Sequence, residues 1–260
     1  MPARRWSAPR AAATARAEGR KSRAQGSTTS LAFVLITTMA ASWAGPAHAE
    51  VGATVSAFSD LRFRGISLSE GRPVGIFDFA YDDPSGFYAD AAASGVVRRG
   101  GEPEPLGIQL SGGYAKRLKS GTTIDFGLTQ SSYTRYSNGQ PNRSYTEVYA
   151  GIARGDFSSR VFLSPHYSVT GRWTAYGELN GNFSLATNWS LNTHVGALVP
   201  LRTPAGQSYR TDFDWRIGLS RTFGPISLHA AWSDGGPGKD HYAGRTHGRS
   251  AFVLGASWAL

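Results

Sequence analysis

The sequence predicts an all-β protein, namely a transmembrane antiparallel up-and-down β-barrel of about 12 strands that follows a cleaved signal peptide. Three observations support this prediction. Apolar and polar residues alternate along most of the chain after residue 50, as expected for strands whose two faces meet different surroundings. Short turns and longer polar loops alternate between these segments, which is the arrangement of outer-membrane barrels. Aromatic residues gather beside the short turns, where such a barrel meets the membrane interface.

Residues 1–49 are expected to be a signal peptide that is absent from the mature chain. Seven basic residues precede an apolar stretch over Leu31–Ala41, and Ala47-His48-Ala49 fits a small-x-small cleavage site. The apolar stretch is shorter than the roughly 20 residues that a spanning helix needs. We therefore expect export and cleavage before Glu50, with residues 50–260 forming one outer-membrane barrel domain.

The charge of the exported part excludes one class of partner. The leader holds seven of the 27 basic residues and one of the 18 acidic residues, which leaves 20 basic and 17 acidic residues, a net charge of +3. Nucleic acid, which the pI near 10.0 of the whole chain would suggest, is therefore not an expected partner. The sequence has no cysteine, so it excludes disulfide bonds, thiolate catalysis and cysteine-bound metals.

The first expected strand is Val51–Arg64, whose last part alternates strictly. Leu61 and Phe63 fall on one face, whereas the charged residues at positions 60, 62 and 64 fall on the other. In a membrane barrel the apolar face would contact lipid and the charged face would line the lumen. We therefore expect Leu61 and Phe63 to face lipid.

Five further strands are expected in the first part of the chain. The aromatic residues of the second strand share one face and Asp78 lies on the other, and the fifth repeats this pattern with Asp125 on its polar face. Proline and glycine mark several of the intervening turns. The expected segments are Val74–Tyr81, Phe87–Val97, Leu106–Tyr114, Thr122–Tyr133 and Tyr145–Ala153.

Six more strands complete the expected barrel. The tenth strand alternates most clearly, because positions 213, 215, 217 and 219 are apolar and Asp212, Asp214 and Arg216 lie between them. The connections after the even-numbered strands up to the tenth are short, which places the start of the chain in the periplasm. The expected segments are Phe157–Tyr167, Arg172–Phe183, Trp189–Val199, Asp212–Leu219, Ile226–Trp232 and Ala251–Leu260.

Three motifs in the first half of the chain resemble those of a known family. Ser59-Asp60-Leu61-Arg62-Phe63-Arg64-Gly65-Ile66-Ser67 is similar to the SD-x-RFRGIS signature of the TorF-like porin family of Gram-negative bacteria. Ser85-Gly86-Phe87-Tyr88-Ala89 is similar to its SGFYA segment, and Tyr145–Gly151 to its YTEVYAG segment. The later strands match only in pattern. The resemblance implies an outer-membrane barrel that acts as a porin.

The polar faces of the strands carry the charged residues that would line the lumen. An arginine or lysine that faces lipid at the membrane midplane costs about 2–4 kcal/mol, so these charges are expected inside. They would either contact solutes or pair with one another and close the lumen. The expected lumen-lining residues are Asp60, Arg62, Arg64, Asp78, Asp90, Asp125, Glu147, Arg160, Glu178, Asp212, Asp214 and Arg216.

The expected function is passive diffusion of small polar solutes through an outer-membrane porin, with no cofactor. The expected partners are these solutes, outer-membrane lipid, lipopolysaccharide and, through the final strand, the barrel assembly machinery. Basic loop residues would face lipopolysaccharide phosphates or remain ordinary solvated charges. These residues are Arg98, Arg99, Arg143, Arg172, Arg202, Arg210, Lys239, Arg245 and Arg249.

Two alternatives remain open from the sequence. One is a closed barrel that does not conduct and serves structure or surface interaction. The other is an outer-membrane hydrolase that uses Asp212 or Asp214 with a histidine. The hydrolase lacks support because no Gly-x-Ser-x-Gly, His-Glu-x-x-His or phosphate-loop motif is present. Asp240, His241 and His247 share one loop, which we expect to be solvated rather than to bind a metal. We therefore predict neither catalytic nor metal-binding residues.

Overall fold

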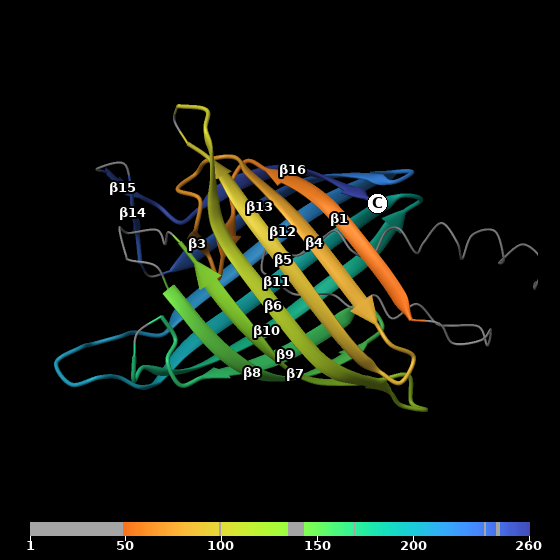
Figure 1. The fold of residues 1–260 in the computed structure, drawn as a ribbon, viewed down its shortest axis with the longest axis horizontal. Coiled ribbons are helices and arrows are strands. Elements are labelled where there is room, and N and C mark those ends of the chain that lie inside the picture. Colours follow the sequence, from red (N-terminus) through yellow and green to blue (C-terminus); the bar gives the residue numbers. More distant parts are fainter. Residues whose placement is uncertain (1–48, 99, 135–142, 169, 237, 243–244) are drawn as a thin grey trace, which may run out of the picture.

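The structure is a computed structural model that describes residues 49–98, 100–134, 143–168, 170–236, 238–242 and 245–260. In this part of the chain, twelve long antiparallel strands form a closed barrel in which the first strand, β1, pairs with the last, β16 (Figure 1). This result confirms the predicted antiparallel up-and-down barrel of about 12 strands. No described helix is long and apolar enough to cross a membrane. Except for their last residues, the expected signal peptide and the expected loop over residues 137–143 lie outside the described residues.

Each wall strand pairs with its neighbours in sequence, and two short hairpins, β2–β3 and β14–β15, interrupt this order. The wall strands lie close to the expected segments, although several are longer, and β6 begins three residues before the expected strand. The wall strands are β1 (Glu50–Phe58), β4 (Val74–Asp82), β5 (Phe87–Val97), β6 (Pro103–Arg117), β7 (Thr123–Tyr133), β8 (Arg143–Arg154), β9 (Phe157–Ser164), β10 (Trp173–Ala186), β11 (Trp189–Arg202), β12 (Asp212–Phe223), β13 (Ile226–Gly236) and β16 (Ala251–Ala259). The short strands are β2 (Arg62–Phe63), β3 (Ile66–Ser67), β14 (Asp240–Tyr242) and β15 (Arg245–His247).

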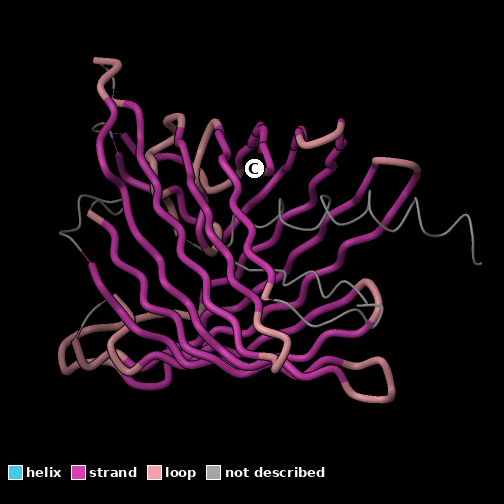
Figure 2. Tube along the Cα trace, turned by 45° about the vertical axis from the view of Figure 1, so that its right-hand side comes forward, coloured by secondary structure: helices cyan, strands magenta, loops and turns pink. Residues whose placement is uncertain are grey.

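Short turns join the wall strands at the end of the barrel where the first strand begins (Figure 2). In the turn between β4 and β5, the amide and hydroxyl of Ser85 donate to Asp83, and these hydrogen bonds lower the pKa of that carboxyl. Gly86 follows with φ +103°, and a Cβ on it would lie 2.5 Å from the carbonyl oxygen of Ala115. Only glycine therefore fits this position.

Aromatic residues pack together beside these turns. The rings of Phe87 and Tyr114 lie 5.1 Å apart across β5 and β6, and those of Phe157 and Phe183 lie 5.3 Å apart across β9 and β10. Both pairs have the edge-to-face arrangement that aromatic rings prefer. The arrangement gives this rim of the barrel an aromatic border.

The outer face of the wall is apolar. Large side chains such as Ile108, Leu128, Val148 and Phe213 are more than half exposed, and comparable residues occur on every wall strand. A soluble monomer seldom exposes a continuous apolar surface larger than a few hundred Å². The outer face therefore has the character of a surface that contacts hydrocarbon rather than water.

The segment after β1 differs from its predicted course. The ladder between β1 and β4 ends where Phe58 pairs with Val74, so the strand stops before residue 60 instead of continuing to Arg64. Leu61 and Phe63 are 0% and 4% exposed, respectively, and belong to a buried cluster inside the barrel. The prediction that they face lipid is therefore wrong. We call residues 60–72, which turn into the lumen, the plug.

Candidate functional site

The tip of the plug is a two-residue turn between β2 and β3. Phe63 pairs with Ile66, and the two residues between them, Arg64 and Gly65, have φ values of +49° and +74°. Positive φ at both positions is typical of a type I′ turn, which reverses a hairpin tightly. The Arg64 side chain is thus placed at the tip of the plug.

Two glycines allow the tip to contact the wall. A Cβ on Gly65 would lie 2.7 Å from the Cα of Gly235 on β13, and a Cβ on Gly235 would lie 2.8 Å from the Cα of Gly65. Real Cβ atoms essentially never approach another atom so closely. The backbone of the plug therefore lies directly against β13.

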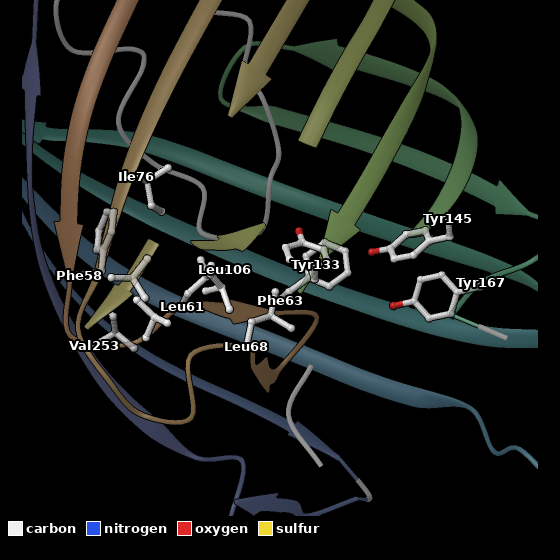
Figure 3. Close-up of a cluster of buried hydrophobic side chains, with 12 residues drawn as sticks. Phe58, Leu61, Phe63, Leu68, Ile76, Leu106, Tyr133, Tyr145, Tyr167 and Val253 are labelled. Carbon is white, nitrogen blue, oxygen red and sulfur yellow. The ribbon is translucent and has the colours of Figure 1, made fainter. Parts of the chain in front are cut away.

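Apolar side chains of the plug fill one layer of the lumen. Leu61, Phe63 and Leu68 are each less than 5% exposed and cluster with wall residues that include Leu106 and Val253 (Figure 3). Burial of one such side chain contributes roughly 1.5–3 kcal/mol. The wall residues of this cluster are Phe58, Val74, Ile76, Val96, Leu106, Tyr133, Tyr145 and Val253, and Tyr167 joins it from the loop after β9.

A buried ion pair holds the tip of the plug to β8. The Nη2 atom of Arg64 lies 3.0 and 2.9 Å from the two carboxylate oxygens of Glu147, and the two residues are 7% and 2% exposed. The guanidinium also stacks over the ring of Tyr176, 3.9 Å from its centroid. The cation therefore has both a counter-charge and an aromatic face, as a buried arginine requires.

Asp60 organises the base of the plug. Its Oδ1 accepts hydrogen bonds from the hydroxyls of Ser67 (2.6 Å) and Ser69 (2.8 Å), and its Oδ2 accepts one from Arg62 (2.9 Å). Arg62 also donates to the carbonyl oxygen of Gly65 at 2.9 Å and to that of Arg249. One carboxylate thus joins both halves of the plug. This charge therefore pairs within the lumen, which is the second of the two roles expected for the lumen-lining charges.

The segment between β13 and β16 also contacts the plug. Asp240 is fully buried, and its Oδ2 accepts a hydrogen bond from the amide of Ser67 at 3.1 Å. Arg249 lies 3.3 Å from Asp240 and 3.5 Å from Asp212. The expectation that Asp240 and Arg249 are solvated loop charges is therefore wrong, because the plug and β12 supply their partners. The described residues contain no cluster of histidine and carboxylate side chains placed to hold a metal ion.

Further polar networks lie on the inward face of the wall. Arg160 donates to Asp125 at 2.8 Å through Nε, and Tyr88 donates to the same carboxylate at 2.7 Å. On the neighbouring part of the wall, His194 lies 2.7 Å from both Asp214 and Asn180. Alternation along the chain indicates no partner for His194, because its partners are found only once the registers of β10, β11 and β12 are known.

The structure distributes the predicted lumen-lining residues between the plug and the wall. Asp60, Arg62 and Arg64 belong to the plug rather than to a strand, because β1 ends before them. Arg64 meets Glu147, but the other pairs form separately around the interior. The buried wall residues are Asp90, Asp125, Glu147, Glu178 and Asp214, and the partly exposed ones are Asp78, Arg160, Asp212 and Arg216.

Two small cavities flank the tip of the plug. One of about 10 Å³ is lined by Arg64, Glu147, Tyr176 and Glu178 among others, and one of about 30 Å³ lies towards β12 and β13. A cavity must offer about 10–15 Å³ to hold one water molecule. The two cavities beside the tip of the plug are therefore large enough for about one to three water molecules.

These features define a twelve-stranded barrel of the outer-membrane type, with a polar interior that an inward-folded segment fills. Its fold is similar to that of the NanC porin, with a TM-score of 0.53 and 9% identity over 81% of this chain and all of that one. It is also similar to the KdgM porin (TM-score 0.49, 10% identity, 80% of this chain and 98% of that one). An outer membrane channel from Pseudomonas putida F1 gives a TM-score of 0.45 with 11% identity, over 83% of this chain and 96% of that one.

The family of the chain follows from its sequence. Residues 41–258 match Gcw_chp, a family described as bacterial protein of unknown function, and the chain belongs to this family. The sequence matches no curated protein.

Proposed function

We propose that the protein is a TorF-like outer-membrane porin through which small polar solutes diffuse passively, and that the plug closes its lumen in the conformation described above. One observation carries this proposal: the element that fills the lumen is separable from the wall. Phe58 and Val74 pair directly, so β1 and β4 form a hairpin whose ladder does not depend on residues 60–72. If the barrel needed a filled interior only for stability, side chains of the wall strands could fill it, and no separate plug would be needed.

Charges on the inward face support a water-filled lumen beyond the plug. Asp78 and Arg216 are only partly buried, although they project from the face opposite the apolar outer surface, whereas Asp212 pairs with Arg249. Isolated charges in a dry interior would cost several kcal/mol each. Their placement therefore favours a hydrated conduit over a dry core.

The proposed location is the outer membrane of a Gram-negative bacterium. The apolar outer face supports contact with lipid, and the basic leader supports export followed by cleavage before Glu50. The barrel assembly machinery would insert the chain through its last strand. Of the proposed lipopolysaccharide contacts, Arg249 is withdrawn because it binds the plug network, and Arg98 already pairs with Glu104.

A closed barrel is the main rival, and the packed apolar layer around Leu61 and Leu68 favours it. A hydrolase has less support. The two ring nitrogens of His194 face Asp214 and Asn180, so neither remains to activate a nucleophile.

Conductance of the refolded wild-type protein in a planar lipid bilayer tests the proposed function. We expect brief conductance steps separated by long closed intervals, because channel opening requires the plug to leave its contacts. A bilayer that stays silent although the inserted protein has an intact strand spectrum by circular dichroism would favour the closed barrel instead.

A further inference from the structure

The larger cavity lies at the boundary between the plug and the wall. Its volume is about 30 Å³, and Gly65 and Val253 form part of its apolar lining. Arg62 and Arg64 reach it from the plug, whereas Arg216 and Ser233, which pair across β12 and β13, reach it from the wall. Its polar lining consists of Arg62, Arg64, His194, Asp214, Arg216 and Ser233.

Several hydrogen-bond donors of this lining have no acceptor among the described residues. These donors are the Nε atom of Arg62, the Nε and Nη1 atoms of Arg64 and the hydroxyl of Ser233, all of which are buried. Arg62 and Arg64 are each 7% exposed. A buried donor without a partner is destabilising, and more so if it is charged, so an acceptor is expected in the space that they share.

Charge also favours an acceptor that is an anion. Arg62 pairs with Asp60, and Arg64 pairs with Glu147. Asp214 also lines the cavity, but His194 and Tyr176 already occupy its carboxylate. Among the arginines of the lining, Arg216 is the one without an ion pair in the described part of the chain, although Asp214 attracts its charge from a distance.

Arg216 has no ion pair or hydrogen bond within the described part of the chain. Glu178, Tyr176 and Asp214 attract its charge from a distance, but no ion pair or hydrogen bond among the described residues joins any of them to Arg216. Guanidinium groups bind carboxylates and other oxyanions through in-plane hydrogen bonds. An anion beside Arg216 would therefore meet an unpaired charge together with the unpaired donors of the plug.

We propose that this cavity is an anion-binding site that takes chloride or the carboxylate group of a small solute. The volume is that of one or two water molecules, which suits a halide or a single carboxylate head. Because two of its arginines belong to the plug and Arg216 belongs to the wall, the anion bridges the two parts. The proposal deepens the proposed function in one respect: a permeating carboxylate would reach this site through the lumen and compete there with chloride.

The line width of the ³⁵Cl nuclear magnetic resonance signal tests the proposal without reference to conductance. We expect the refolded wild-type protein in detergent to broaden the chloride signal, and acetate to reverse the broadening by competition. Arg216→Gln should weaken chloride binding about tenfold, because it removes a charged hydrogen-bond donor. Ser233→Ala should weaken it about threefold, because it removes a neutral one, and this variant keeps the test available if Arg216→Gln does not fold.

Arg221→Gln is the matched control. Arg221 lies on the same strand, but it is exposed and stacks over Trp189 and Phe223 at the rim, so its substitution should leave chloride binding unchanged. Equal binding by wild type, Arg216→Gln and Ser233→Ala would overturn the site, and failure of acetate to compete would overturn its carboxylate class. Chloride binding by a protein that never conducts would contradict the proposed porin function but leave the anion site intact.

Discussion

Replacement of residues 60–72 by a short Asn-Gly turn is expected to convert the closed barrel into an open channel. Phe58 and Val74 already form the last pair of the β1–β4 ladder, and Ser59 and Pro73 remain beside the new turn. The connection therefore becomes the four-residue loop Ser-Asn-Gly-Pro, a length that hairpins commonly use. The change removes Leu61, Phe63 and Leu68 from the lumen together with Arg64, which spans it to reach Glu147. Liposomes that contain this variant should swell in small sugars at least about tenfold faster than wild-type liposomes, because twelve strands enclose a lumen intermediate between filled barrels and open porins.

A loop of the same end of the barrel provides the control for this experiment. Residues 203–211 connect β11 to β12 and extend away from the wall (Figure 1). Shortening this loop should leave the swelling rate near that of the wild type. Equal swelling rates for the plug replacement and the wild type would show that the plug does not close the lumen.

Glu147→Ala is expected to have the largest effect on stability of any single substitution in the plug network. It leaves Arg64 buried without a counter-charge, and removal of one partner of a buried ion pair costs about 3–5 kcal/mol. The loss should appear as a lower free energy of unfolding in urea, or as a plug that leaves the lumen and gives longer openings in a bilayer. Both the lower unfolding free energy and the longer openings would result from the unpaired charge of Arg64.

The matched control is Glu104→Ala, which removes the acidic partner of an exposed pair with Arg98. An exposed ion pair contributes little because water and salt screen it, so this variant should unfold and conduct like the wild type. If Glu147→Ala matched Glu104→Ala in both measurements, the pair between Arg64 and Glu147 would have no role in holding the plug.

The wall of the barrel could be predicted from the sequence, because period-two alternation is a local property. Positions 124, 126 and 128 of β7 and positions 213, 215, 217 and 219 of β12 are apolar, and the lipid-facing side of a barrel strand must be apolar where it crosses the membrane. Most of the short turns could likewise be located from a glycine, whereas the turn after β10 uses Asn188 at positive φ instead. Both features are readable without knowledge of which strands pair.

The plug could not be predicted in the same way. Leu61 and Phe63 alternate with charged residues as a lipid-facing strand would, and no local signal marks the end of the ladder at Phe58. The positive φ of Arg64, a residue that rarely adopts it, is imposed by the contacts of the folded lumen. Within this turn, Gly65 carries a local sequence hint, since glycine is frequent in tight turns.

Partners that come from distant parts of the chain were also missed. Asp240 and Arg249 looked like solvated loop charges because their partners, Ser67 and Asp212, lie in other segments. His194 meets Asp214 and Asn180 only through the register of three strands. Alternation fixes which side of the wall a residue faces, but it does not fix its height along the barrel axis.

The central claim is that residues 60–72 lie folded within the lumen, and the reactivity of one engineered thiol tests it most directly. The chain has no cysteine, so Ser67→Cys introduces a unique label site at a fully buried position, and Ser85→Cys introduces one in an exposed turn. In folded protein we predict that a water-soluble maleimide labels Cys at position 85 rapidly and at position 67 at least about a hundredfold more slowly, with equal rates after unfolding, because local opening must precede reaction. Equal labelling of both positions in the folded barrel would contradict the account.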